Sequence, residues 1–346
     1  MLFGIFALAT VTTDERKRRH GSVLWFASGL FLALLIGLRR RVGGDWHAYE
    51  RIFDHLRNVE LGSALVAADP AYSVLNIFAA DLGLGVWAVN LVCAAIFTVG
   101  LLRFCRDQPN PMLALLVAIP YLVIVVAMGY TRQSAALGLV MLALSYQTRS
   151  DVVRVALCLA LATTFHKSAI IVVPLMALAT SRRRILTILL LVITAGITYW
   201  LFIASSLDRL VTNYVGARYS SSGAGIRIAM NLVPAALFLL FRNRFSPDRQ
   251  ERRLWAIFSI ASFVALLMLY ETPSSTAVDR LSLYLIPLQI VVLSRLPIAF
   301  VGRGAPDFAF KAGVIAYSLA VQFVWLNYAE NAPAWVPYHN YLAGSE

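Results

Sequence analysis

The residues best suited to chemistry are a few polar side chains set between long apolar segments. His166 and Lys167 follow Phe165 in a stretch that is otherwise apolar. An ionisable pair at membrane depth is costly, which indicates a functional site, and a histidine can act as a general base near neutral pH. A structural histidine, hydrogen-bonded at a helix break, is the alternative interpretation.

A second motif places Arg132 at the start of an apolar segment, directly after Tyr130 and Thr131. The free N–H groups and the dipole of a helix N-terminus favour an anion. A guanidinium at that point adds two parallel hydrogen bonds to a phosphate. The motif therefore indicates a phosphate site, although an arginine that reaches out to lipid headgroups would give the same pattern.

The stretch that begins at Arg41 combines acidic, aromatic and glycine residues. Asp45 and Tyr49 are four residues apart, so a helix would place them on one face. Gly43-Gly44 allow a turn or a close approach of the backbone, and Trp46 and Tyr49 can stack on sugar rings. An amphipathic interfacial helix with aromatic anchors explains the same spacing.

Two later features complete the set of polar groups. A Ser- and Gly-rich loop, 205–227, contains Arg218 and has the composition of a mobile loop that can gate a site. Asp279-Arg280 open a further apolar segment and Tyr284 lies one turn on. Asp279 can also be read as the cap of that helix.

Most of these features carry an isolated cation, and few carboxylates accompany them. A cationic pocket walled by apolar helices suits a lipid-linked phosphate with a sugar head. The sequence predicts that these cations share one outer face: Arg41, Arg132, Lys167, Arg218 and Arg280.

The elements that must position these residues are membrane helices. The chain has 346 residues, of which 60% are hydrophobic and 14% charged, far from the balance of soluble domains. About 20 apolar residues span a bilayer. The composition predicts one all-α, polytopic transmembrane domain over 1–346, with clear spans at 22–38, 86–102, 112–128, 185–203, 226–241, 254–270, 281–296 and 310–328.

Three shorter apolar stretches bring the expected total to eleven or twelve helices. Segment 2–13 is a partial first helix, and 133–147 follows a tight return at Gly129. Segment 153–181 is read as two short helices meeting at Phe165–His166–Lys167, which puts His166 at the tip of a re-entrant hairpin. The long connection 39–85 is expected outside the cytoplasm with an interfacial helix, as is the loop 204–226.

Orientation follows from the basic residues, since Lys and Arg mark cytoplasmic loops. With the cluster 14–20 inside, roughly two thirds of the 30 Lys and Arg residues fall on the cytoplasmic side. The net charge of +12 is therefore a topology signal and does not indicate a nucleic-acid partner. The three cysteines, which lack metal-site spacing, predict neither a disulfide framework nor a zinc site.

At these motifs the sequence resembles the EpsG family of bacterial exopolysaccharide polymerases, relatives of the Wzy-type O-antigen polymerases. Family members usually read G-T-D-Y where this chain has Gly43 to Trp46, and often Glu at Asp69. The remaining matches extend to Arg280 and Tyr284. The matching segments are Arg41-Val-Gly-Gly-Asp45-Trp-His-Ala-Tyr49, Asp69-Pro-Ala-Tyr72, Thr131-Arg132-Gln133-Ser134-Ala135 and Phe165-His166-Lys167-Ser168-Ala169.

The resemblance implies a membrane polymerase with an architecture like that of lipid-dependent (GT-C-like) glycosyltransferases. Such an enzyme sits in the bacterial inner membrane and joins oligosaccharide repeat units carried on undecaprenyl diphosphate at the periplasmic face. It uses no nucleotide sugar, cofactor or metal ion. Its expected partners are the lipid bilayer, the lipid-linked oligosaccharide, and flippase and chain-length regulator proteins.

The hypothesis that joins these observations gives each residue a role. Arg132 holds the diphosphate leaving group, with Lys167, Arg218 and Arg280 as helpers, and His166 or Asp45 accepts the acceptor proton. Substrate-binding roles go to Arg41, Trp46, Tyr49, Tyr72, Tyr130 and Tyr284. Two alternatives remain: a transporter or flippase of lipid-linked sugars, and a single-sugar transferase or membrane acyltransferase.

Overall fold

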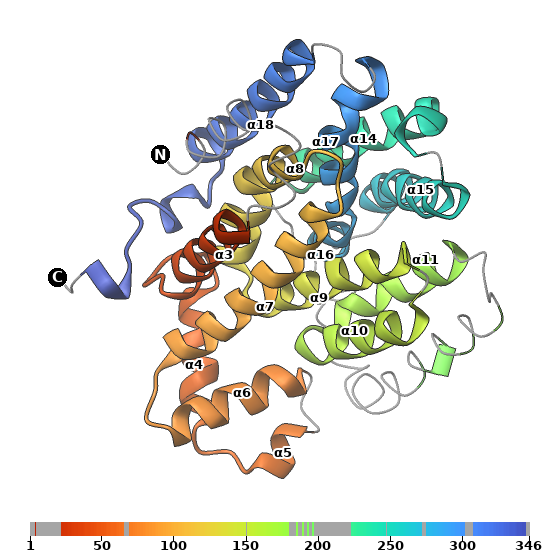
Figure 1. Cartoon of the computed structure of the whole chain (residues 1–346). Coiled ribbons are helices and arrows are strands. Elements are labelled where there is room, and N and C mark those ends of the chain that lie inside the picture. The colour runs from red at the N-terminus through yellow and green to blue at the C-terminus, as the bar shows by residue number, and fades with distance from the viewer. Residues whose placement is uncertain are drawn as a thin grey trace.

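The computed structural model describes residues 22–65, 69–149, 151–179, 223–246, 248–271, 275–301 and 307–343, with a few isolated positions elsewhere. Within these ranges every regular element is a helix (Figure 1), which confirms the predicted all-α, polytopic fold. The predicted spans 2–13 and 185–203, and all of the loop 204–226 that precedes Gly223, lie outside the described residues. Arg218 lies outside them as well.

Four helices in the described part are long and apolar enough to cross a bilayer. They confirm the spans predicted at 86–102, 226–241, 254–270 and 310–328. Each extends a few residues beyond the apolar run. These helices are α7 (Val86–Arg106), α14 (Ala224–Phe245), α15 (Arg249–Glu271) and α18 (Phe308–Tyr328).

Shorter apolar helices pack beside α7. Helix α9 (Thr131–Gln147) lies between α7 and α10 (Val152–Phe165), and α3 (Ser22–Gly37) packs on α7 from the other direction. The backbones of α7 and α9 approach closely: a Cβ added at Gly138 would meet the Cα of Phe97 at 2.5 Å. Small residues permit such approaches in membrane proteins, and this contact fixes the position of α9 and of Arg132 at its start.

The chain breaks at His166. Helix α10 ends at Phe165, His166 is extended (φ −156°, ψ 113°), and the 3₁₀ helix η2 (Lys167–Ile171) leads into α11 (Val172–Ala179). At 1.5 Å per residue the 14 residues of α10 extend only about 21 Å, which is short of a full span. The predicted division of 153–181 into two arms at His166 is therefore confirmed.

Two other predicted spans are not regular α-helices over their whole length, and each contains a proline where the regular α-helix is interrupted. The predicted span 112–128 is an α-helix, α8 (Pro111–Ala118), continued as a π-helix, η1 (Ile119–Ala127), which contains Pro120. The segment 281–296, which was predicted as a single span, is not one continuous helix. It is a bent pair, with a 42° bend at Pro287, because a proline ring lacks the N–H for a helical hydrogen bond and clashes with the preceding turn. The parts of this pair are α16 (Ser275–Ser282), the 3₁₀ helix η6 (Leu283–Leu285) and α17 (Pro287–Val301).

The connection between α3 and α7 is itself helical. It contains α4 (Trp46–Leu56), α5 (Leu61–Leu65) and α6 (Pro70–Asp81), with α4 packed on α6 (Figure 1). Proline at the first position of α6 suits a helix start, since its missing N–H has no partner there. These helices carry Asp45, at the start of α4, and Asp69, at the start of α6, to the beginning of α9.

Candidate active site

Arg132 is the centre of a polar cluster near the start of α9. It lies in the first turn of α9, where Tyr130 is the N-cap residue. Its Nη1 donates a 2.6 Å hydrogen bond to Oδ2 of Asp69. Its guanidinium also lies over the rings of Tyr49 and Tyr72, 5.8 and 5.7 Å from their centroids. A carboxylate and two aromatic faces therefore hold the cation in one orientation.

Asp69 joins Arg132 to the break at His166. Its side chain makes no hydrogen bond to its own helix, although it occupies the N-cap position of α6. Oδ1 instead accepts from the backbone N–H of Lys167 at 3.3 Å and lies 3.8 Å from Nδ1 of His166. Only 5% of Asp69 is exposed. One buried carboxylate thus contacts an arginine and a histidine from two different segments.

The surroundings of Asp69 favour its charged form. Burial by itself raises the pKa of this carboxyl group, but the neighbouring His166, the charge of Arg132 and the N–H of Lys167 together lower the pKa below its ordinary value. Asp69 is therefore ionised at neutral pH. The result is a fixed ion pair at the start of α9.

His166 is placed as an oriented base would be. It is 6% exposed, and its Nδ1 has no hydrogen-bond partner among the described residues. The 3.8 Å separation from Asp69 is longer than a hydrogen bond. Carboxylate and imidazole in this relation resemble the orienting pair of general-base sites.

A second arginine–carboxylate pair lies beside the first. Nη2 of Arg280 is 4.0 Å from Oδ2 of Asp45. The backbone carbonyl of Arg280 accepts a 2.6 Å hydrogen bond from Nε2 of Gln133, the residue after Arg132. One turn after Arg280, the hydroxyl group of Tyr284 lies 3.2 Å from that of Ser168. The bent pair α16–α17 is thereby tied both to α9 and to the His166 break.

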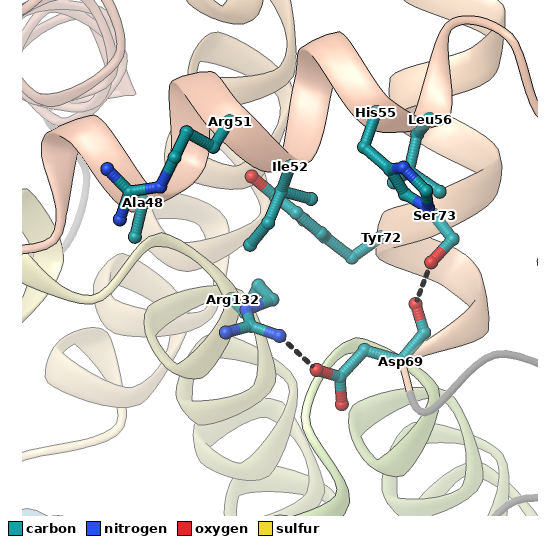
Figure 2. Close-up of a pocket in the computed structure, with 9 residues that line it drawn as sticks. All are labelled: Ala48, Arg51, Ile52, His55, Leu56, Asp69, Tyr72, Ser73 and Arg132. Atoms are coloured by element: carbon teal, nitrogen blue, oxygen red, sulfur yellow. Dashed lines mark hydrogen bonds and ion pairs between the residues drawn. The ribbon is translucent and has the colours of Figure 1, made fainter.

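A cavity of about 450 Å³ opens over the Arg132–Asp69 pair, between α4 and α6 (Figure 2). Its volume lies within the range of about 300–1,000 Å³ that is typical of small-molecule sites. Arg132 and Asp69 face it from α9 and α6. The other lining residues are Ala48, Arg51, Ile52, His55, Leu56, Tyr72 and Ser73.

The aromatic residues predicted to bind sugars are mostly inside the protein. Trp46, Tyr49 and Tyr72 are 3%, 4% and 1% exposed, and of these Tyr72 lines the cavity. Tyr49 and Tyr72 meet edge to face, with centroids 5.9 Å apart. Tyr130 is partly buried. These rings form the wall behind the arginine, and their contact with sugars stays a prediction.

The arginines near residue 40 lie in different environments, and the one predicted to bind substrate is not in the cavity. Arg41 is exposed and has a left-handed backbone (φ 54°), and it does not line the cavity. Arg39, which the sequence did not single out, is 1% exposed and donates to the carbonyls of Ile36 and Val42 and to Oγ1 of Thr131. Arg39 therefore holds the residue that precedes Arg132 from inside the bundle.

Asp69 is the other residue missed as a member of the site. Its position before Pro70 has the pattern of an ordinary helix cap, so the spacing gave no reason to set it apart. The signal was present only in the family pattern, which includes Asp69. Among the described residues no three His, Cys, Asp or Glu side chains lie close enough to hold a metal ion.

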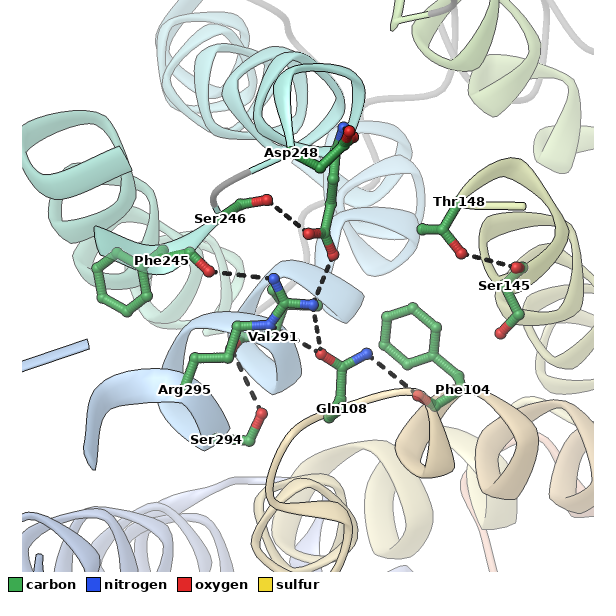
Figure 3. A network of polar contacts seen from close by, with 11 residues as sticks. Phe104, Gln108, Ser145, Thr148, Phe245, Ser246, Asp248, Val291, Ser294 and Arg295 are labelled. Carbon is green, nitrogen blue, oxygen red and sulfur yellow. Dashed lines mark hydrogen bonds and ion pairs between the residues drawn. The ribbon is translucent and has the colours of Figure 1, made fainter. Parts of the chain in front are cut away.

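A separate polar network surrounds Arg295, which lines a cavity together with Ser145 and Thr148 at the C-terminal end of α9 (Figure 3). Nη2 of Arg295 contacts Glu251 at 2.6 Å and Gln108 at 2.9 Å, and Nη1 donates to the carbonyl of Phe245. Ser246 donates to Glu251. The network joins the ends of α7, α14, α15 and α17. Its groups are satisfied by one another, as buried charges must be.

Comparison with known proteins gives one match. The model of the EpsG family matches residues 22–340, nearly the whole chain. The match includes Asp45, Asp69, Arg132, His166 and Arg280. No curated protein and no solved structure matches the chain.

Proposed function

The chain belongs to the EpsG family, an exopolysaccharide polymerase-like family, and from that membership we propose that it joins lipid-linked oligosaccharide repeat units. The proposed carrier is undecaprenyl diphosphate, and the proposed setting is the periplasmic face of a bacterial inner membrane. The observation that carries the proposal is that Arg132, Asp69 and His166 meet near the start of α9, where Arg132 and Asp69 line one cavity. A phosphate-binding group and a base are the two things that this transfer needs.

The reaction begins with a hydroxyl group of the acceptor unit. As its oxygen attacks the anomeric carbon of the donor glycan, the hydroxyl proton passes to the base. The new bond between oxygen and carbon forms while the bond from that carbon to the diphosphate oxygen breaks. The diphosphate leaves with the electron pair, still attached to its lipid.

His166 is the proposed base, with Asp45 as the alternative. Nδ1 of His166 faces Asp69, so the opposite ring nitrogen, Nε2, is the one that accepts the proton. The Asp69 carboxylate then stabilises the imidazolium that forms. Asp45 is the alternative because it is much more exposed, with 38% of its side chain accessible, and its nearest charged partner is Arg280 at 4.0 Å.

Arg132 is the proposed clamp for the leaving diphosphate. Electrostatic stabilisation of developing charge is the largest single contribution in many enzymes. The guanidinium is fixed by Asp69 and two tyrosine rings, yet 31% of its side chain is exposed, so it remains open to a ligand. Arg280, Lys167 and Arg218 are the proposed helpers.

Substitution of the clamp and the base tests the proposal. Arg132→Ala and His166→Ala should each reduce polymer formation by about 10²–10³-fold, as loss of one such group does elsewhere. The measurement is the length and yield of polysaccharide made by membranes that contain equal amounts of each folded variant.

Arg149→Ala is the matched control. Arg149 follows the opposite end of α9, is exposed, and pairs with Asp107 at 3.0 Å. We expect wild-type chain lengths from this variant. Wild-type chain lengths from both Arg132→Ala and His166→Ala would refute the assignment of the site.

A further inference from the structure

Helix α4 carries an arginine and a histidine that are not paired with its own carboxylates. Glu50 pairs with His47 at 3.0 Å, and Asp54 pairs with Arg57 at 3.8 Å. Arg51 and His55 have no carboxylate partner among the described residues. They are four residues apart, so they lie one turn from each other on the same face of the helix.

That face of α4 borders the cavity above Arg132. Both Arg51 and His55 line it, opposite the Arg132–Asp69 pair (Figure 2). Asp69 is the one carboxylate in the lining, and it is already bound to Arg132 at 2.6 Å. The lining is therefore cationic overall, with two arginines and an imidazole around one engaged carboxylate. An anion is the ligand that such a cavity favours.

We infer that Arg51 and His55 form a second anion subsite, which holds the diphosphate of the other lipid-linked substrate. The inference rests on the proposed function, because a reaction that joins two lipid-linked chains brings two diphosphates to one face at once. Arg132 holds the diphosphate that leaves. Arg51 and His55 hold the one that stays attached to the acceptor unit, on the α4 side of the same cavity.

A lipid headgroup is the competing source of an anion at an interfacial helix. Arg57 separates the two cases. It is the C-cap residue of the helix that carries Arg51 and is well exposed, but it is paired with Asp54 and does not line the cavity. A headgroup site spread along α4 would involve Arg57 as much as Arg51. A subsite inside the cavity would not.

Binding of inorganic pyrophosphate to the full-length protein tests the inference. The protein is placed in nanodiscs of zwitterionic lipid, and titration calorimetry gives the dissociation constant for pyrophosphate, with glucuronate as a carboxylate probe. Hydrogen bonds to a charged group contribute about 1.5–3 kcal/mol. Arg51→Ala should therefore weaken pyrophosphate binding by roughly tenfold or more, and Arg51→Ala with His55→Ala by more still. Arg57→Ala should bind as wild type does.

Three results would overturn the subsite: equal pyrophosphate affinity in Arg51→Ala and wild type, an equal loss in Arg57→Ala, or binding of glucuronate in preference to pyrophosphate. The proposed function fails in a different way. In that case the wild-type protein binds pyrophosphate through Arg51 but does not lengthen a lipid-linked oligosaccharide.

Discussion

At the residue scale, one carboxylate organises the candidate site. Asp69 binds Arg132 with one oxygen and approaches His166 and the Lys167 N–H with the other. The arginine and the histidine come from chain segments more than 30 residues apart, on α9 and after α10. Their relative position therefore depends on a third residue from α6. This arrangement explains how isolated cations on separate helices can form one site.

The Asp69–Arg132 pair should make stability depend on pH in a defined direction. The pKa of Asp69 lies below its ordinary value of 3.8 in the folded protein. Its contribution is therefore complete above about pH 5 and is lost as the pH falls below about 4. Asp69→Asn should lower the free energy of unfolding by about 1–3 kcal/mol at pH 7.

Thermal unfolding in detergent measures this effect. In a His166→Gln background, which removes the histidine that is electrostatically coupled to Asp69, the difference in Tm between the protein with Asp69 and its Asp69→Asn variant should be constant from pH 8 to pH 5 and should shrink as the pH is lowered to about 3.5. A difference that grows as the solution becomes more acidic would contradict the assignment of a lowered pKa to Asp69.

The sequence identified two of the three central residues. Arg132 and His166 were predictable because a charge inside an apolar segment has a cost that needs a reason. Asp69 was not, since an acidic residue before a proline has an ordinary explanation as a helix cap. Arg39 and Arg41 are both arginines at the end of an apolar segment, and only Arg41 was singled out from the sequence. Only the fold shows which of the two side chains points into the helix bundle.

At the element scale, the C-terminal strap (residues 329–343) fixes the two turns that carry the site. Ala334 and His339 accept backbone hydrogen bonds from Gly43 and Arg40. The Nε1 of Trp335 donates to the carbonyl of Ile124 in the π-helix η1 at 2.8 Å. Its ring covers Gly129, where an added Cβ would lie 2.6 Å from a ring carbon. The strap thus binds the turn before α4 to the turn before α9.

Removal of the Trp335 ring should loosen both turns together. Trp335 is 5% exposed, and loss of a buried tryptophan side chain costs about 3–5 kcal/mol. Trp335→Ala should therefore lower the Tm and reduce polymer yield per folded protein. Val336→Ala is the control, because Val336 is adjacent but 56% exposed. An equal Tm for the two variants would show that the strap does not hold the turns.

Some elements were predictable from charge and apolar length, and others were not. The break at His166 followed from the need to keep the flanking arginines on one side of the membrane. The bend before Pro287 was missed because the apolar run continues across it. The strap has no periodic pattern, and its contacts are to residues some 200 to 300 positions earlier, so nothing local in the sequence reveals it.

At the scale of the whole molecule, the two polar clusters lie at opposite ends of the helices and have different chemistry. The candidate site is open to a cavity and contains cations that are partly exposed. The Arg295–Glu251–Gln108 network also borders a cavity, of about 500 Å³, but it joins four helices and its members satisfy one another. The first has the form of a binding site, and the second has that of a structural clamp.

Substitution in the clamp should affect stability without altering the site. Glu251→Gln leaves Arg295 without its carboxylate partner, and Arg295 is 8% exposed. Breaking a buried ion pair costs about 3–5 kcal/mol. The Tm of this variant should fall, while chain length per folded protein stays at the wild-type value. Arg154→Ala, which breaks an exposed pair with Asp151, should cost no more than about 1 kcal/mol.

The most direct measurement uses purified protein in liposomes supplied with a single lipid-linked oligosaccharide repeat unit. The account predicts a ladder of products that grows by whole repeat units, and loss of that ladder in His166→Ala and Arg132→Ala. Movement of the unlengthened oligosaccharide across the bilayer, or the addition of one sugar followed by arrest, would contradict the account.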